Sequence, residues 1–163
     1  MNRRGEPKHP RSCHERALGL LAVRPRSRRE LERRLLAARF EAEEVEDVLT
    51  RLEGVGLVDD AAFAKQYAEH RFGNRREGSR AVVQGLRAAG IAPALAEAVS
   101  KEASDDDEER AAELARSRAS RLAGVAPQKA FARLSSLLMR RGYGPEIARR
   151  AARRALEISV DDG

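Results

Sequence analysis

Arginine is the residue type whose number and spacing in this sequence indicate a chemical role. Lys and Arg together number 32, against 26 for Asp and Glu, and most of the basic residues are arginines. The planar guanidinium group donates two parallel hydrogen bonds to a phosphate or a carboxylate. The candidate binding residues cluster at predicted helix starts, helix corners and one helix face: Arg24, Arg26, Arg28, Arg29, Arg71, Arg75, Arg76, Arg80, Arg140, Arg141, Arg149, Arg150, Arg153 and Arg154. These arginines predict a surface for a polyanion or an acidic protein.

The alternative interpretation is that these arginines are surface charges paired with glutamate. In the last predicted helix, the arginines at 149–154 follow i, i+4 spacing and form one basic stripe, with Glu146 and Glu157 as the nearby acids in sequence. This segment therefore favours binding. Arg33 and Arg34 lie beside glutamates, so both interpretations stay open for them.

The sequence contains no motif for nucleotide binding, nucleophilic catalysis or zinc binding. The sequence contains no Gly-x-x-x-x-Gly-Lys-Ser/Thr motif, and no nucleophile with an adjacent base can be identified. His9, His14 and His70 are scattered and do not match zinc-ligand spacing with Cys13, the single cysteine. We therefore predict no catalytic residue, no metal and no cofactor, and that the protein is not an enzyme.

Acidic and hydroxyl residues are better explained as helix caps. Asp59-Asp60 and Asp105 to Asp107 resemble divalent-metal ligands, but both groups stand where helices are predicted to begin. We expect one of Asp59 and Asp60, and Ser104 with its following acids, to cap helices. Ser27 and Glu30 have the spacing of a capping box, in which each side chain accepts from the other residue's backbone amide.

A short sequence motif occurs twice and indicates an internal repeat. Gly90-Ile91-Ala92-Pro93 and Gly142-Tyr143-Gly144-Pro145 both place Gly after one helix and Pro at the start of the next, and Arg39-Phe40 occupies a first copy without Gly or Pro. Apolar residues lie five and nine positions before each corner, namely Leu35 and Leu31, Leu86 and Val82, and Leu138 and Leu134. Three repeats are therefore predicted.

Hydrophobic periodicity predicts nine helices and no strand, over 13–23, 27–39, 42–53, 60–72, 79–89, 93–102, 105–122, 128–141 and 145–157. The predicted fold class is all-α, with three tandem three-helix repeats stacked into an elongated curved rod. We place a flexible basic arm at 1–12, repeats at 13–58, 59–103 and 104–158, and a tail at 159–163. Small modules with 4% aromatic residues need neighbours to bury enough surface.

Charge and hydropathy limit location and partners. The net charge of +6 is segregated, with basic segments at 1–39 and 111–157 and an acidic one at 40–60. The sequence has no apolar run of about 20 residues, as a membrane span requires. The single cysteine fits a reducing compartment. We expect a cytoplasmic monomer that does not bind membranes.

Residues 17–91 resemble the RecX family of bacterial RecA regulators. The resemblance depends on the segment from Arg24 to Leu31 with Leu35, then on Gly56 to Asp60 with Phe63 and Tyr67, and finally on Arg71, Gly78, Leu86 and Gly90-Ile91. It implies an all-helical protein that lodges in the groove of the RecA filament on DNA. It further implies inhibition of ATP hydrolysis and strand exchange in DNA repair, recombination and the SOS response.

Two other functions remain open at this level. The helix pairs could form helix–turn–helix-like corners that bind DNA directly, although the helix of the first repeat that would enter the groove, residues 42–53, is acidic. The chain could also be a helical-repeat scaffold for another acidic protein. Steep loss of DNA binding with rising salt would favour the first of these.

Overall fold

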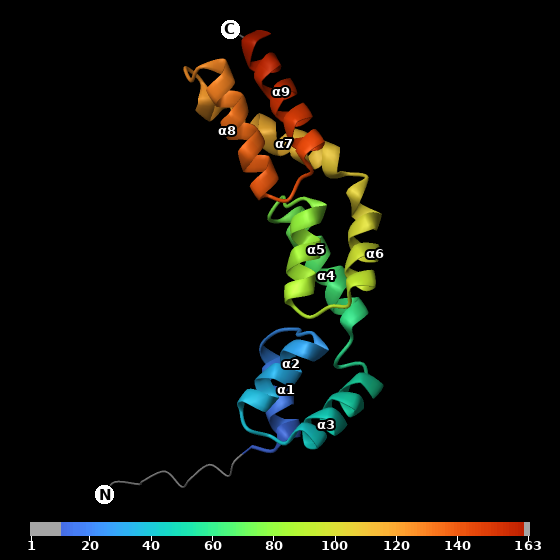
Figure 1. Cartoon of the computed structure of the whole chain (residues 1–163). Coiled ribbons are helices and arrows are strands. Elements are labelled where there is room, and N and C mark those ends of the chain that lie inside the picture. Colours follow the sequence, from blue (N-terminus) through green and yellow to red (C-terminus); the bar gives the residue numbers. More distant parts are fainter. Residues whose placement is uncertain (1–10, 162–163) are drawn as a thin grey trace, which may run out of the picture. The chain divides into compact units, whose positions relative to one another are not determined.

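The structure is a computed structural model that describes residues 11–161, and this part of the chain is helical throughout, with no strand (Figure 1). The predicted all-α fold of three-helix units is confirmed. The helices are α1 (Cys13–Val23), α2 (Arg28–Ala37), α3 (Ala42–Gly54), α4 (Asp60–Gly73), α5 (Ser79–Ala88), α6 (Pro93–Ser104), α7 (Asp107–Ala119), the 3-10 turn η1 (Ser120–Leu122), α8 (Pro127–Arg140) and α9 (Pro145–Asp161).

The predicted caps are confirmed in part. Ser27 accepts a hydrogen bond from the Glu30 amide at 3.1 Å, but the Glu30 carboxylate turns to arginines and does not return to the cap, so the predicted capping box is wrong there. A complete box occurs instead at Ser12 and Glu15, ahead of α1. Asp59 caps α4 by accepting from the Ala62 amide at 3.0 Å.

The predicted cap at Ser104 is wrong, because α6 continues to that residue. Its hydroxyl donates to the Lys101 carbonyl within the last turn of α6. α7 starts at Asp107, and the preceding Asp106 makes no side-chain cap hydrogen bond. At the far end, α9 reaches Asp161 and is therefore longer than predicted.

The chain divides into two compact units, which we describe separately. One contains the chain up to Phe63 together with Ala89–Ile91, and the other contains Ala64–Ala88 and the chain from Ala92 onward. In the first unit, α1, α2 and α3 enclose a buried core. Its members are Cys13, Ala17, Leu31, Leu35, Val45, Val48, Leu49, Leu52 and Val58.

In the second unit, α7, α8 and α9 pack around a core rich in alanine. The buried side chains are Ala111, Leu114, Ala115, Ala119, Leu134, Leu138, Tyr143, Ala148, Ala151, Ala152 and Ala155. Small side chains allow the helix backbones to approach closely, while Leu134, Leu138 and Tyr143 supply most of the buried volume. The core positions predicted from the repeat are thus buried in this domain.

The helix corners adopt left-handed backbone conformations. Gly90 has φ +84° and Gly142 has φ +95°, while Arg39, the residue at the first corner, has φ +67°. Glycine enters this region without a steric cost, whereas an L side chain resists it. The repeat predicted from sequence is therefore a repeat of backbone conformation as well.

Each glycine corner lies directly against the start of a middle helix within its own unit. In the second unit, the Gly78 amide donates to the Arg141 carbonyl at 2.8 Å, and the Arg80 amide donates to the Gly142 carbonyl at 3.1 Å. A Cβ atom on Gly142 would lie 2.5 Å from the Ala81 nitrogen. The contact therefore leaves no room for a side chain.

The first unit contains the matching contact. The Ser27 hydroxyl donates to the Ala89 carbonyl, and a Cβ on Gly90 would lie 2.6 Å from the Arg29 Cβ. An aspartate completes the contact in both units: Asp60 accepts from the Arg28 amide at 2.9 Å, and Asp107 accepts from the Ser79 amide at 3.2 Å. Both helix starts thus gain a partner for an otherwise unpaired amide.

We predict that Gly142→Ala lowers the free energy of unfolding by about 2–4 kcal/mol, because it combines a left-handed conformation with a backbone clash. Gly124→Ala is the matched control, since Gly124 has φ +80° but a Cβ added there would meet nothing within 4 Å. It should cost about 1 kcal/mol. Urea denaturation measures both, and equal losses would show that the corner contact contributes nothing.

Candidate functional site

The first group of predicted arginines is held by a shared glutamate. Arg24 and Arg26 each donate to Glu30 at 2.5 Å, and Arg34 also reaches it at 3.3 Å. Arg26 is only 6% exposed, and its Nε donates to the Leu20 carbonyl at 3.1 Å. Arg26 thus ties α2 to the end of α1, and little of its side chain is exposed.

The next two arginines of this group differ in their surroundings. Arg28 pairs with Glu46 and Glu53 of α3, at 2.7 Å in both cases, and so links α2 to α3. These ion pairs raise the pKa of Arg28, with the Glu46 hydrogen bond as the largest cause. Arg29 is exposed, and its aliphatic stem lies beside Gly90.

Arg71 also serves the interior of its own domain. It donates to Glu77 at 2.6 Å and to the Tyr67 hydroxyl at 2.7 Å, and its guanidinium lies 4.9 Å from the Tyr67 ring centre. The partners lie on α4 and on the loop that leads to α5. Arg71 therefore fixes the turn between these helices.

The basic stripe of α9 is partly neutralised. Arg149 pairs with Glu146 at 3.1 Å, and Arg150 pairs with Glu108 of α7 at 2.5 Å. The second partner was not predicted, because Glu108 is distant in sequence. Among the described side chains, which end at Glu157, no acid lies within 4.0 Å of the charged groups of Arg153 or Arg154, and both arginines are exposed on the face opposite the buried alanines.

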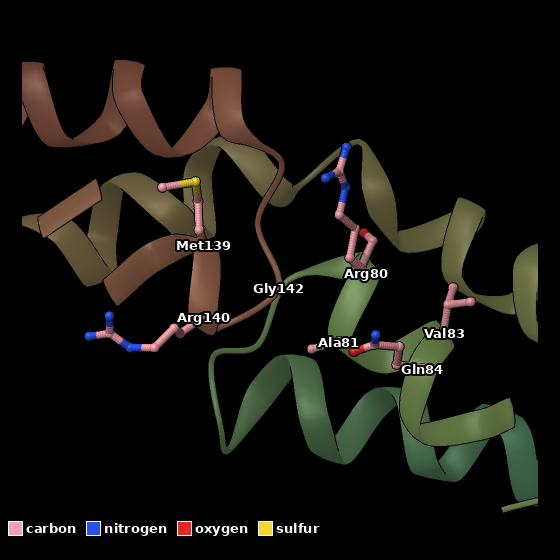
Figure 2. Close-up of a pocket in the computed structure, with 8 residues that line it drawn as sticks. Arg80, Ala81, Val83, Gln84, Met139, Arg140 and Gly142 are labelled. Atoms are coloured by element: carbon pink, nitrogen blue, oxygen red, sulfur yellow. The ribbon is translucent and has the colours of Figure 1, made fainter. Parts of the chain in front are cut away.

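Arg80 and Arg140 border a hollow of about 450 Å³ beside the Gly142 corner. Figure 2 shows the two side chains extending in different directions on either side of the labelled Gly142. Both arginines are exposed. They do not converge on one point, so this hollow presents two separate charges.

A second hollow on the same corner gathers five arginines. It measures about 530 Å³, and no acidic side chain is among the residues that line it. The lining consists of Asn74, Arg75, Arg76, Leu114, Ser117, Arg118, Arg121 and Arg141. We call this the arginine hollow. It brings together Arg75, Arg76 and Arg141 of the predicted set with two further arginines.

Hydrogen bonds from two side chains to backbone carbonyls hold the walls of the arginine hollow in place. Arg141 donates from Nη1 to the Arg75 carbonyl at 2.7 Å, and the Tyr143 hydroxyl donates to the Arg76 carbonyl at 2.8 Å. Arg76 has φ +50°, so this loop is held in an uncommon conformation. Burial raises the pKa of Tyr143 to about 12, so the hydroxyl remains a donor even at pH values at which an ordinary tyrosine ionises.

Arg118 and Arg121 were missed by sequence reasoning. They lie in the last turn of α7 and in η1, and their side chains reach the hollow because α7 passes close to the α4–α5 loop. The only signal in the sequence was the basic character of residues 111–157. That charge excess identified a basic segment but could not show that two of its members face Arg75 and Arg76.

Two other kinds of site have no support in the described part of the chain. No group of three or more His, Cys, Asp or Glu side chains is placed to hold a metal ion there. His9 lies outside the described residues. Among the described helices, none is long and apolar enough to cross a membrane.

The fold defines an all-helical protein of three-helix units, and arginines border two hollows on its second unit. Family models for the first, second and third three-helix domains of RecX match residues 13–52, 59–99 and 105–152. The chain belongs to the RecX family of regulatory proteins, which is not a family of enzymes.

Individual relatives agree with this assignment. The chain is 37% identical over 164 residues to Regulatory protein RecX of Streptomyces coelicolor, covering 98% of this chain and 86% of the relative. It is also 37% identical over 151 residues to Regulatory protein RecX of Mycolicibacterium smegmatis, covering 85% and 79%. The crystal structure of RecX from Lactobacillus salivarius has a similar fold, with TM-score 0.80, 20% identity and coverage of 90% and 95%.

We predict that Glu30→Gln destabilises the first unit most strongly at neutral pH. Burial alone raises the pKa of Glu30, but hydrogen bonds from Arg26 and Arg24 outweigh it and hold the pKa below its ordinary value. A depressed folded-state pKa adds stability above the unfolded pKa, and this is lost as pH falls through the folded value. The variant should lose about 2 kcal/mol at pH 7.

Denaturant unfolding at pH 7 and at pH 3 measures this difference. We expect the stability gap between wild type and variant to narrow at the lower pH. Glu157→Gln is the control, because Glu157 is exposed and has no ion pair among the described residues. A gap of constant size at both pH values would contradict an ion-pair role for Glu30.

Proposed function

We propose that this protein binds the RecA–DNA filament and inhibits ATP hydrolysis and strand exchange by the recombinase. The observation that carries the proposal is the match of all three RecX domains along one chain. Basic surface on the second unit supports it, since a DNA-bound filament is polyanionic. The setting is DNA repair, recombination and the SOS response in the cytoplasm, with the protein acting as a monomer.

The proposed contact residues are the predicted arginines other than Arg24, Arg26, Arg28 and Arg71. Arg24, Arg26, Arg28 and Arg71 are tied to acids of their own unit, which favours a structural role for these four. The contact set that we retain comprises Arg29, Arg75, Arg76, Arg80, Arg140, Arg141, Arg149, Arg150, Arg153 and Arg154. Arg149 and Arg150 belong to this set, but their ion pairs with Glu146 and Glu108 partly neutralise the charge that they offer to a partner.

Inhibition of this kind needs no catalytic group. Three domains in one chain can contact successive recombinase subunits and oppose the movements that accompany nucleotide turnover. Occupation of a filament groove also excludes a second DNA. The acidic surface of α3, including the exposed Glu43, Glu44 and Asp47, would face basic groups of the recombinase or solvent.

Insertion of α3 into a DNA groove is a poor alternative. The exposed residues of α3 are largely acidic and would be repelled by phosphates. A helix–turn–helix mode therefore lacks a suitable recognition helix in the first domain. A scaffold for an unrelated acidic protein would use the same arginines but predicts no effect on RecA.

We predict that substoichiometric amounts of this protein inhibit the single-stranded-DNA-dependent ATPase of RecA. Bound molecules would block turnover in several neighbouring subunits, so inhibition should exceed the molar ratio of added protein. ATP hydrolysis is measured at low salt with DNA in excess. Unchanged hydrolysis at equimolar protein would contradict the proposal.

An unrelated single-stranded-DNA-dependent ATPase provides the control. If the protein acted only by covering DNA, both enzymes would be inhibited to the same extent. Selective inhibition of RecA supports binding to the recombinase filament. Equal inhibition would favour a DNA-binding protein without recombinase specificity.

A further inference from the structure

The arginine hollow concentrates more positive charge than the fold requires. Five arginines line about 530 Å³, and among the side chains that the structure describes, which end at Glu157, no carboxylate lies within 4.0 Å of their guanidinium groups. Elsewhere in the second unit, Arg149 and Arg150 have acidic partners, whereas the exposed Arg153 and Arg154 have none among the described side chains. What distinguishes the arginine hollow is that five guanidinium groups surround one space, where an anion would reduce their mutual repulsion.

The lining identifies the class of anion. Arginines from three separate segments line the hollow, and Asn74 and Ser117 add small polar side chains. The C-terminal ends of α4 and α7 each contribute about half a negative charge, which five full positive charges exceed. No aromatic side chain lines the hollow, so base stacking is absent and contact is limited to phosphate groups.

The surroundings favour an extended polymer over a compact ligand. The arginine hollow and the hollow lined by Arg80 and Arg140 adjoin the same corner, at residues 140–142. A strand with one phosphate per nucleotide can place successive charges in both. A small phosphorylated compound would leave Arg80 and Arg140 without a partner.

We propose that the arginine hollow binds the phosphate backbone of a nucleic-acid strand directly, without the recombinase, and that Arg118 and Arg121 are essential contacts. This proposal extends the proposed function by naming a DNA contact site on the second unit. Because no base is read, binding should be independent of sequence. Arg75, Arg76 and Arg141 complete the set of phosphate donors.

The test is fluorescence anisotropy with a labelled 20-nucleotide single strand, the full chain and no recombinase. The double variant Arg118→Gln/Arg121→Gln should weaken binding about tenfold and reduce the slope of log affinity against log salt by about 1.4, since each lost phosphate contact removes about 0.7. Strands of thymine and of adenine should bind alike.

Arg116→Gln/Arg133→Gln is the matched control. It removes the same charge from exposed positions on α7 and α8 that do not line the hollow, and it should change affinity less than about twofold. Equal weakening by both double variants would overturn the proposal, because it would show only a general effect of net charge. Thermal unfolding monitored by circular dichroism verifies that both variants are folded.

Binding of tripolyphosphate tests whether the hollow takes a small phosphorylated ligand instead of a nucleic-acid strand. Binding of tripolyphosphate that depends on Arg118 and Arg121, without binding of the oligonucleotide, would overturn the proposal in favour of a small phosphorylated ligand. Since RecA is absent, failure here leaves the ATPase result unaffected. Conversely, DNA binding through the hollow would stand even if RecA were not inhibited.

Discussion

Close contact between a glycine corner and the start of a middle helix is the constraint on which the rest of the structure depends. It occurs at Gly90 in the first unit and at Gly142 in the second, each time with an aspartate on the neighbouring helix amide. A backbone hydrogen bond from Gly78 to Arg141, and a hydrogen bond from the Arg141 side chain to the Arg75 carbonyl, fix the loop at 75–78 against the Gly142 corner. The arginine hollow exists because these two loops are held together.

The division between structural and available arginines follows from the same packing. Where a neighbouring helix of the unit presents glutamate, as α3 does to Arg28 and α7 does to Arg150, the guanidinium is used internally. Where arginines line a hollow together, as Arg75 and Arg118 do, no acidic side chain is among the lining residues. Under the proposed function, the elements that lie next to each arginine decide whether its charge can contact a partner.

Periodicity and glycine spacing were sufficient to predict the helices, the repeat and most of the core. Leu31, Leu86 and Leu138 are buried because a repeat of backbone conformation requires a repeat of apolar positions. Sequence could not predict the fate of single arginines. The partners of Arg28 and Arg150 lie on other helices, and Arg118 lines the same hollow as Arg76, a loop residue with a left-handed backbone conformation.

The start of α8 differs from the starts of α2 and α5 in needing no aspartate from another helix. α2 and α5 begin with amides that take an aspartate from further along the chain. α8 begins roughly one turn earlier relative to its corner, and it begins with Pro127, which has no amide hydrogen to satisfy. The first residue of α8 therefore has no backbone amide that needs an aspartate as acceptor. The aspartate contact that α2 and α5 receive from a later helix is not required at this position.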